Sequence, residues 1–139
     1  MRTAFAAGAE RARDGGVRGF MSAPYTILFV EDDVGVREST TTILSAHGFR
    51  MLVARNADEA LAYLEREHVD VLFTDVVMPG VNGIALAKQA TARRPALKIM
   101  FMTAYYSRAA EAAALGKLMF KPVREAEMVA GLRELIALE

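Results

Sequence analysis

The sequence predicts an α/β protein whose five parallel strands form one doubly wound sheet with helices on both faces. Three observations predict this class. First, the apolar runs at 25–30, 69–73 and 97–102 are nearly continuous, which is typical of strands buried on both faces. Second, segments with helical patterns separate these runs. Third, the connections are short, and with right-handed crossovers such alternation gives a parallel sheet covered on both sides.

The first half of the chain alternates strand and helix twice. After the strand at 25–30, Asp33 is placed to cap a helix at 34–46, and Gly48 closes that helix. A second strand follows at 49–54. Asn56 then has the pattern of an N-cap with an acid, Glu59, three residues later. The helix that it begins is expected to end near residue 68.

The second half repeats the alternation three times. The strand from Val69 ends on Asp75, because Met78-Pro79-Gly80 cannot extend a central strand and must turn. A Pro at position 95 stops the helix that follows Asn82-Gly83. The remaining expected elements are helices at 84–92, 108–115 and 124–138 and strands at 97–103 and 118–120.

Composition excludes several classes of protein. The 139 residues suit one domain, and 53% hydrophobic residues suffice for a full core. Lys+Arg and Asp+Glu are 17 each, which gives no reason to expect binding to DNA. The absence of cysteine excludes disulfides and thiolate metal sites and fits a reducing cytoplasm. The apolar runs are too short for a membrane span, so we predict a cytoplasmic protein that is not inserted in a membrane.

The N-terminal residues 1–22 differ from the rest of the chain. They contain four arginines, many alanines and the break Gly15-Gly16, without the apolar core of a signal peptide. We interpret 1–22 as an appendage, disordered or helical, that takes no part in chemistry. The alternative is a docking or dimerising helix. Residues 23–139 form the predicted domain.

Chemically useful side chains follow four of the predicted strands at their carboxyl ends. These are Glu31 and Asp32 after the first strand, Asp75 at the third, Thr103 at the fourth and Lys121 after the fifth. The carboxyl ends of parallel strands lie at one edge of the sheet, where ligands bind in such folds. The sequence therefore predicts one pocket with three carboxylates, a hydroxyl and an ammonium group.

The charges in this pocket predict a divalent cation. Three crowded carboxylates repel one another, and Lys121 offsets only one of them. All the ligands are hard oxygens, which favours Mg²⁺. Since Mg²⁺ takes one or two protein carboxylates, one Asp is left to act as a covalent acceptor of a phosphoryl group. The Lys121 ammonium and the Thr103 hydroxyl can then contact phosphate oxygens.

The ordered set of motifs resembles the receiver domain of two-component response regulators over residues 24–139. The motifs are Val30-Glu31-Asp32-Asp33, Asp75-Val76-Val77-Met78-Pro79-Gly80, Asn82-Gly83, Thr103-Ala104 and Lys121-Pro122. The resemblance implies a flavodoxin-like sheet of order 2-1-3-4-5. It also implies that Asp75 accepts phosphate from a phosphohistidine.

The same resemblance implies a role for each matching residue. Asp32 holds Mg²⁺ directly and Glu31 holds it through water, and the backbone carbonyl of Val77 is a further ligand beside Asp75. Thr103 is the switch hydroxyl. Lys121 binds the phosphate.

Two positions differ from the family pattern. The family often has Tyr or Phe three residues before the lysine, and this chain has Leu118 there. Tyr105, two residues after Thr103, is interpreted as a surface or core residue, with gating of the site as the alternative. His47 and His68 stand apart from the acidic edge, and we interpret both as structural or solvent-facing residues.

No output domain follows Glu139, so we expect a stand-alone receiver that signals by protein contact or serves in a phosphorelay. Its expected partners are a sensor histidine kinase or phosphotransfer protein and an unidentified downstream protein, and homodimerisation is left open. Its only expected catalysis is its own phosphorylation and dephosphorylation. The alternatives are a phosphorylation-independent binding module and a Mg²⁺-dependent phosphatase. The phosphatase would need a second Asp where Val77 stands.

Overall fold

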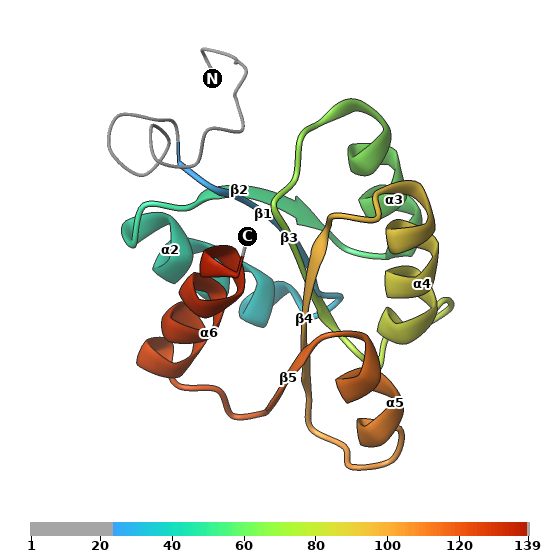
Figure 1. Ribbon diagram of the computed structural model, residues 1–139. Coiled ribbons are helices and arrows are strands. Elements are labelled where there is room, and N and C mark those ends of the chain that lie inside the picture. The colour runs from blue at the N-terminus through green and yellow to red at the C-terminus, as the bar shows by residue number, and fades with distance from the viewer. Residues whose placement is uncertain (1–23, 139) are drawn as a thin grey trace.

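The computed structural model describes residues 24–138 and contains one five-stranded parallel sheet of order β2-β1-β3-β4-β5 (Figure 1). This confirms the predicted fold class and strand order. The interpretation of residues 1–22 lies outside the described residues. The strands are β1 Thr26–Val30, β2 Arg50–Ala54, β3 Val71–Asp75, β4 Lys98–Thr103 and β5 Lys117–Phe120.

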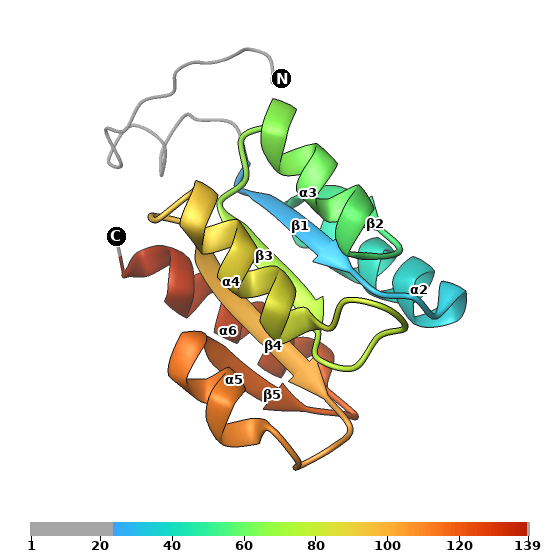
Figure 2. The same cartoon turned by 90° about the vertical axis from the view of Figure 1, so that its right-hand side faces the viewer.

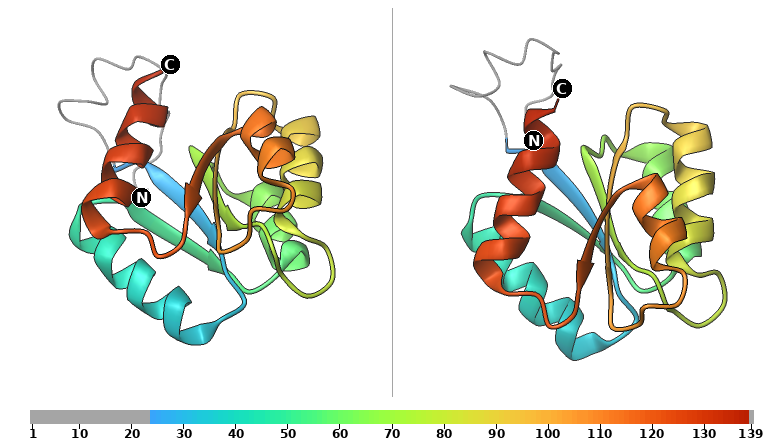
Figure 3. Two further views of the ribbon diagram at one scale, coloured as in Figure 1. Left: turned by 90° about the horizontal axis from the view of Figure 1, so that it is seen from below. Right: turned by 60° about the horizontal axis from the view of Figure 1, so that its bottom comes forward.

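Five helices cover both faces of the sheet. They are α2 Val34–Ala46, α3 Ala57–Arg66, α4 Gly83–Arg93, α5 Ala109–Leu115 and α6 Glu125–Ala137. Helices α2 and α6 pack on one face, and α3, α4 and α5 pack on the other, as the views along the sheet show (Figure 3). Figure 2 looks onto the face that α3, α4 and α5 cover. Among the described residues, no helix is long and apolar enough to cross a membrane.

The sheet separates two apolar cores because successive strand residues point to opposite faces. In β1, Leu28 and Val30 pack under α3, α4 and α5, whereas Ile27 and Phe29 pack under α2 and α6. All four side chains are fully buried. The near-continuous apolar runs therefore reflect burial on both faces, as predicted.

Side-chain caps fix where three helices begin. The carboxylate of Asp33 accepts a hydrogen bond from the amide of Val36, and the amide oxygens of Asn56 and Asn82 accept bonds from the amides of Glu59 and Ala85. These caps begin α2, α3 and α4 at the first residue after the cap in each case.

Long-range contacts move some of the predicted boundaries. Helix α3 ends at Arg66 rather than near residue 68, and the guanidinium of Arg94 donates to the carbonyl oxygens of Leu64 and Glu67 at this end. Strand β3 begins at Val71 rather than at residue 69, and β5 begins one residue early at Lys117, which pairs with Met100 of β4. These contacts join residues far apart in sequence, so a local pattern does not report them.

Candidate functional site

The predicted site residues lie at the carboxyl ends of the strands. Asp75 is the last residue of β3 and Thr103 the last residue of β4. Glu31 and Asp32 follow β1, and Lys121 follows β5. Because β3 lies between β1 and β4, the Asp75 side chain is central at this edge of the sheet.

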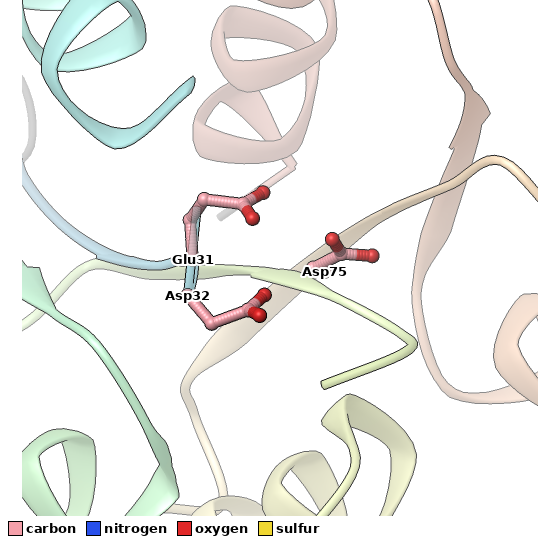
Figure 4. Close-up of side chains that lie close together, drawn as sticks. All are labelled: Glu31, Asp32 and Asp75. Carbon is pink, nitrogen blue, oxygen red and sulfur yellow. The ribbon is translucent and has the colours of Figure 1, made fainter. Parts of the chain in front are cut away.

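Three carboxylates form an acidic cluster, defined here as Glu31, Asp32 and Asp75 (Figure 4). One carboxylate oxygen from each residue lies within 4.8 Å of the others. Glu31 is 1% exposed and Asp75 is 5% exposed, whereas Asp32 is exposed to solvent. Burial of two like charges side by side is unfavourable unless a cation compensates them.

The ammonium group of Lys121 supplies part of this compensation. Its Nζ lies 2.8 Å from Oδ2 of Asp75 and 3.4 Å from Oε1 of Glu31. Burial of the amine opposes its charge, but the hydrogen bond from Lys121 to Asp75 and the charges of Asp75 and Glu31 outweigh burial and raise the pKa of Lys121. Lys121 therefore remains charged at neutral pH.

The surroundings of Glu31 do not fully compensate the burial of its carboxylate and its repulsion by Asp75. Burial of its carboxylate is the largest influence, and with the charge of Asp75 it raises the pKa of Glu31 above the ordinary value of 4.5. The Asp33 amide, which donates to Oε2 of Glu31 over 3.0 Å, and the charge of Lys121 offset only part of this effect. One lysine thus does not neutralise the acidic cluster.

Among the described residues, the carboxylate of Asp32 accepts the fewest hydrogen bonds of the three. Within residues 24–138 its side chain accepts no hydrogen bond, whereas Asp75 also accepts one from the amide of Val77 over 3.3 Å. An exposed carboxylate beside two buried ones gives an open, all-oxygen donor set. This set fits a hard divalent cation such as Mg²⁺, because such an ion takes one or two carboxylates and keeps several waters.

Thr103 is buried at the same edge of the sheet as this cluster. Its hydroxyl oxygen accepts a hydrogen bond from the amide of Tyr105 over 3.1 Å, and within the described part of the chain it donates to no acceptor. The amide of Lys121 donates to the Thr103 carbonyl oxygen over 2.8 Å, which keeps the two residues adjacent. A buried donor without a partner is costly, so this hydroxyl is available to an incoming acceptor.

Sequence reasoning missed Arg37. Its guanidinium donates to the carbonyl oxygens of Glu31 and Asp32 over 2.9 and 3.2 Å, and so holds the loop that carries both acids. A cation in the first turn of a helix opposes the helix dipole. The position of Arg37 near the start of α2, a few residues after the acids, is the signal that could have identified it.

The other singled-out residues lie outside the acidic cluster. Tyr105 is 57% exposed and is a surface residue, and Leu118 is partly buried against the core under α3, α4 and α5. His47 pairs with Glu125, and His68 pairs with Asp70. The two histidines are therefore engaged elsewhere in the fold.

Comparisons with known proteins agree on one family. The family model of the response regulator receiver domain matches residues 27–133. The chain is 32% identical over 114 residues to the response regulator receiver protein CpdR of Brucella abortus (strain 2308), covering 79% of this chain and 95% of that protein. It spans only 21% and 17% of the length of two other curated relatives.

Solved structures give the same result. A CheY-like response regulator receiver domain protein from Methanospirillum hungatei JF-1 superposes with a TM-score of 0.78 at 27% identity, covering 83% of this chain and 95% of that one. The response regulator TrrA from Thermotoga maritima, solved in complex with Mg²⁺-BeF, superposes with a TM-score of 0.75 at 25% identity. That match covers 80% of this chain and 98% of TrrA.

Proposed function

Because the chain belongs to the response regulator receiver domain family, we propose that Asp75 accepts a phosphoryl group from a phosphohistidine of a sensor histidine kinase or phosphotransfer protein. The observation that carries the proposal is the contact of Lys121 Nζ with Asp75 Oδ2 at 2.8 Å, at the edge of the sheet where Glu31 and Asp32 also lie. It places an ammonium group against the carboxylate that would receive the phosphate.

In the proposed transfer, a carboxylate oxygen of Asp75 attacks the phosphorus atom of the donor. The new bond is between that oxygen and phosphorus, and the bond that breaks joins phosphorus to the imidazole nitrogen, which leaves with the electron pair. Such a transfer has a loose transition state, so positioning and neutralisation of charge supply most of the catalysis. The site residues are suited to these two tasks.

Lys121 and Thr103 each have a defined task in this proposal. The ammonium of Lys121 moves from a carboxylate oxygen to a phosphoryl oxygen, a contact of the same kind and charge. The Thr103 hydroxyl donates to a second phosphoryl oxygen, which satisfies a buried donor that otherwise lacks a partner.

We propose that the acidic cluster holds Mg²⁺, with Asp32 as a direct ligand, Glu31 acting through water, and Asp75 and the backbone carbonyl of Val77 completing the protein ligands. The bound cation would neutralise charge on the transferred phosphoryl group. The TrrA complex with Mg²⁺-BeF supports this assignment by similarity. Arg37 keeps the acidic loop in place through its two carbonyl contacts.

The test is phosphorylation by acetyl phosphate with Mg²⁺, followed by intact mass. The wild-type protein should gain the mass of one phosphoryl group, and Asp75→Asn should gain none. Asp58→Asn is a matched control, since Asp58 lies in the first turn of α3 and outside the acidic cluster. Phosphorylation of Asp75→Asn to the wild-type extent would show that another residue is the acceptor.

We propose that the phosphorylated protein signals by contact with a downstream protein or passes its phosphate along a relay. The second candidate is a protein-binding module that acts without phosphorylation. Leu118, where the family often has an aromatic side chain, is the observation that favours it. Cells that carry Asp75→Asn separate the two functions: lost signalling supports phosphorylation, and retained signalling supports the module.

A further inference from the structure

A second pocket lies at the edge of the sheet opposite the acidic cluster. Residues 68–70, between α3 and β3, and residues 93–98, which lead from α4 into β4, line a hollow of about 710 Å³. We call it the amino-edge pocket, because Figure 2 shows both connections at the end of the sheet where the strands begin. The 5 residues of β3, at about 3.3 Å each, separate this pocket from the Asp75 end of the strand, so it is not part of the candidate site.

Basic side chains outnumber acidic ones in the amino-edge pocket. The lining side chains that can carry a charge are Arg93, Arg94, Lys98, His68 and the single acid Asp70. Two neighbours already engage the Asp70 carboxylate, which is only 6% exposed: the amide of Thr26 donates to Oδ2 over 2.8 Å, and Nε2 of His68 lies 3.0 Å from Oδ1. The pocket therefore has an excess of positive charge that attracts anions.

The three permanent cations are not neutralised by close, buried carboxylates. Within residues 24–138, the ammonium of Lys98 makes no hydrogen bond or ion pair. The guanidinium of Arg94 donates to two main-chain carbonyl oxygens at the end of α3, which are uncharged. Arg93 lies 3.6 Å from Glu65, but these side chains are 45% and 72% exposed, and such a surface pair contributes little. Arg93 and Lys98 can thus turn to an incoming anion.

The pocket also offers apolar surface between these cations. Val69 and Leu97 are buried beneath it, and Pro95 and Ala96 are exposed along its wall. Its volume is within the range of about 300–1,000 Å³ that is usual for pockets that hold small molecules. A phosphate ion alone would fill only a small part of this space. A ligand that joins an apolar ring to phosphate groups matches both the volume and the lining.

We propose that the amino-edge pocket binds a phosphate-bearing small molecule of nucleotide size. Lys98 contacts the phosphate groups as a point charge, and Arg93 contacts them through its planar guanidinium, which matches the geometry of phosphate oxygens. The apolar part of the ligand lies against Pro95 and Ala96. This binding uses no residue of the acidic cluster, so it is independent of phosphate transfer to Asp75.

The experiment titrates the full, ¹⁵N-labelled chain with ADP and, separately, with inorganic pyrophosphate. Both titrations contain EDTA, so that no metal ion carries the probe to the acidic cluster. We expect saturable shifts of the amide signals of residues 68–70 and 96–98. The amide signals of Glu31, Asp32 and Asp75 should move less, because they lie at the other end of the strands.

Three variants that each remove one positive charge test the assigned contacts. Lys98→Gln and Arg93→Gln should each weaken the binding of both probes about tenfold, because each loses a charge-assisted hydrogen bond to phosphate. Lys88→Gln is the matched control: Lys88 lies on α4, as Arg93 does, but pairs with Glu111 and does not line the pocket. This control should bind both probes as the wild type does.

The outcomes decide both the site and the kind of ligand. Tighter binding of ADP than of pyrophosphate would support a ligand that also uses the apolar wall, whereas equal or weaker binding of ADP would overturn that part and leave a site for phosphate groups alone. Absence of saturable shifts at the pocket for either probe below about 1 mM would overturn the proposal. Equal losses of affinity in Lys88→Gln and Lys98→Gln would also overturn it, because they would indicate a general attraction of anions to the surface.

Discussion

Replacement of Gly83 by alanine should destabilise the protein because this position has no room for a side chain. Gly83 is the first residue of α4 and packs against the backbone of the residue proposed as acceptor. A Cβ atom there would overlap the carbonyl oxygen of Asp75 and lie 2.9 Å from its carbonyl carbon and 3.1 Å from Cα of Val76. All three neighbours are backbone atoms, so no side-chain rotation relieves the overlap.

The expected loss is about 2–3 kcal/mol of the free energy of unfolding. Overpacking costs about 1–3 kcal/mol, and the upper part of that range applies because the clash is with backbone. If α4 moves away from β3 to relieve the overlap, the hydrogen bond from the Gly83 amide to the Val76 carbonyl oxygen, 2.8 Å in the wild type, is weakened as well. Such a hydrogen bond contributes about 1 kcal/mol. The greater helix propensity of alanine returns at most about 1 kcal/mol.

Urea denaturation measures this loss, and Gly35→Ala is the matched control. Gly35 lies in the first turn of α2, and its added Cβ would meet only Oδ1 of Asp33 at 3.4 Å. The control should be unchanged or stabilised by up to about 1 kcal/mol. If Gly83→Ala unfolds at the same urea concentration as the wild type, the close packing of α4 on Asp75 is wrong.

Three further predictions concern the charges of the site. Asp32→Asn should lower the affinity for Mg²⁺ at least about tenfold, since even outer-shell partners of metal ligands contribute that much. Calorimetric titration measures this loss, and an unchanged affinity would remove Asp32 from the ligand set. Without metal, in EDTA, Lys121→Met should lower the free energy of unfolding by about 1–3 kcal/mol, because it leaves the carboxylates of Asp75 and Glu31 without their cation. Added Mg²⁺ should restore part of this loss. A variant as stable as the wild type in EDTA would contradict the pairing. The raised pKa of Glu31 favours folding fully below pH 4.5, and this contribution is lost as the pH rises through the raised folded pKa. Without metal, Glu31→Gln should therefore gain stability relative to the wild type as the pH rises above 4.5. Urea titrations at several pH values measure this gain, and a difference that stays constant with pH would refute the assigned shift.

Much of the fold followed from local signals. The caps Asp33, Asn56 and Asn82 each begin a helix because a cap satisfies amides only two or three residues away. Continuous apolar runs identified buried strands, since burial on both faces removes the polar alternation. The order of the strands did not follow from these patterns and came from the resemblance of the motifs.

The sequence by itself determined that Asp75, Glu31, Asp32, Thr103 and Lys121 stand at strand ends, and parallel strands then place them at one edge. Only the tertiary structure decided how they are paired. Contacts such as Lys121 with Asp75, Arg94 with the end of α3, and Tyr106 with Phe120 join residues separated by 14 to 46 positions. No local periodicity encodes such contacts, because the packing of the whole sheet and its helices fixes which side chains meet.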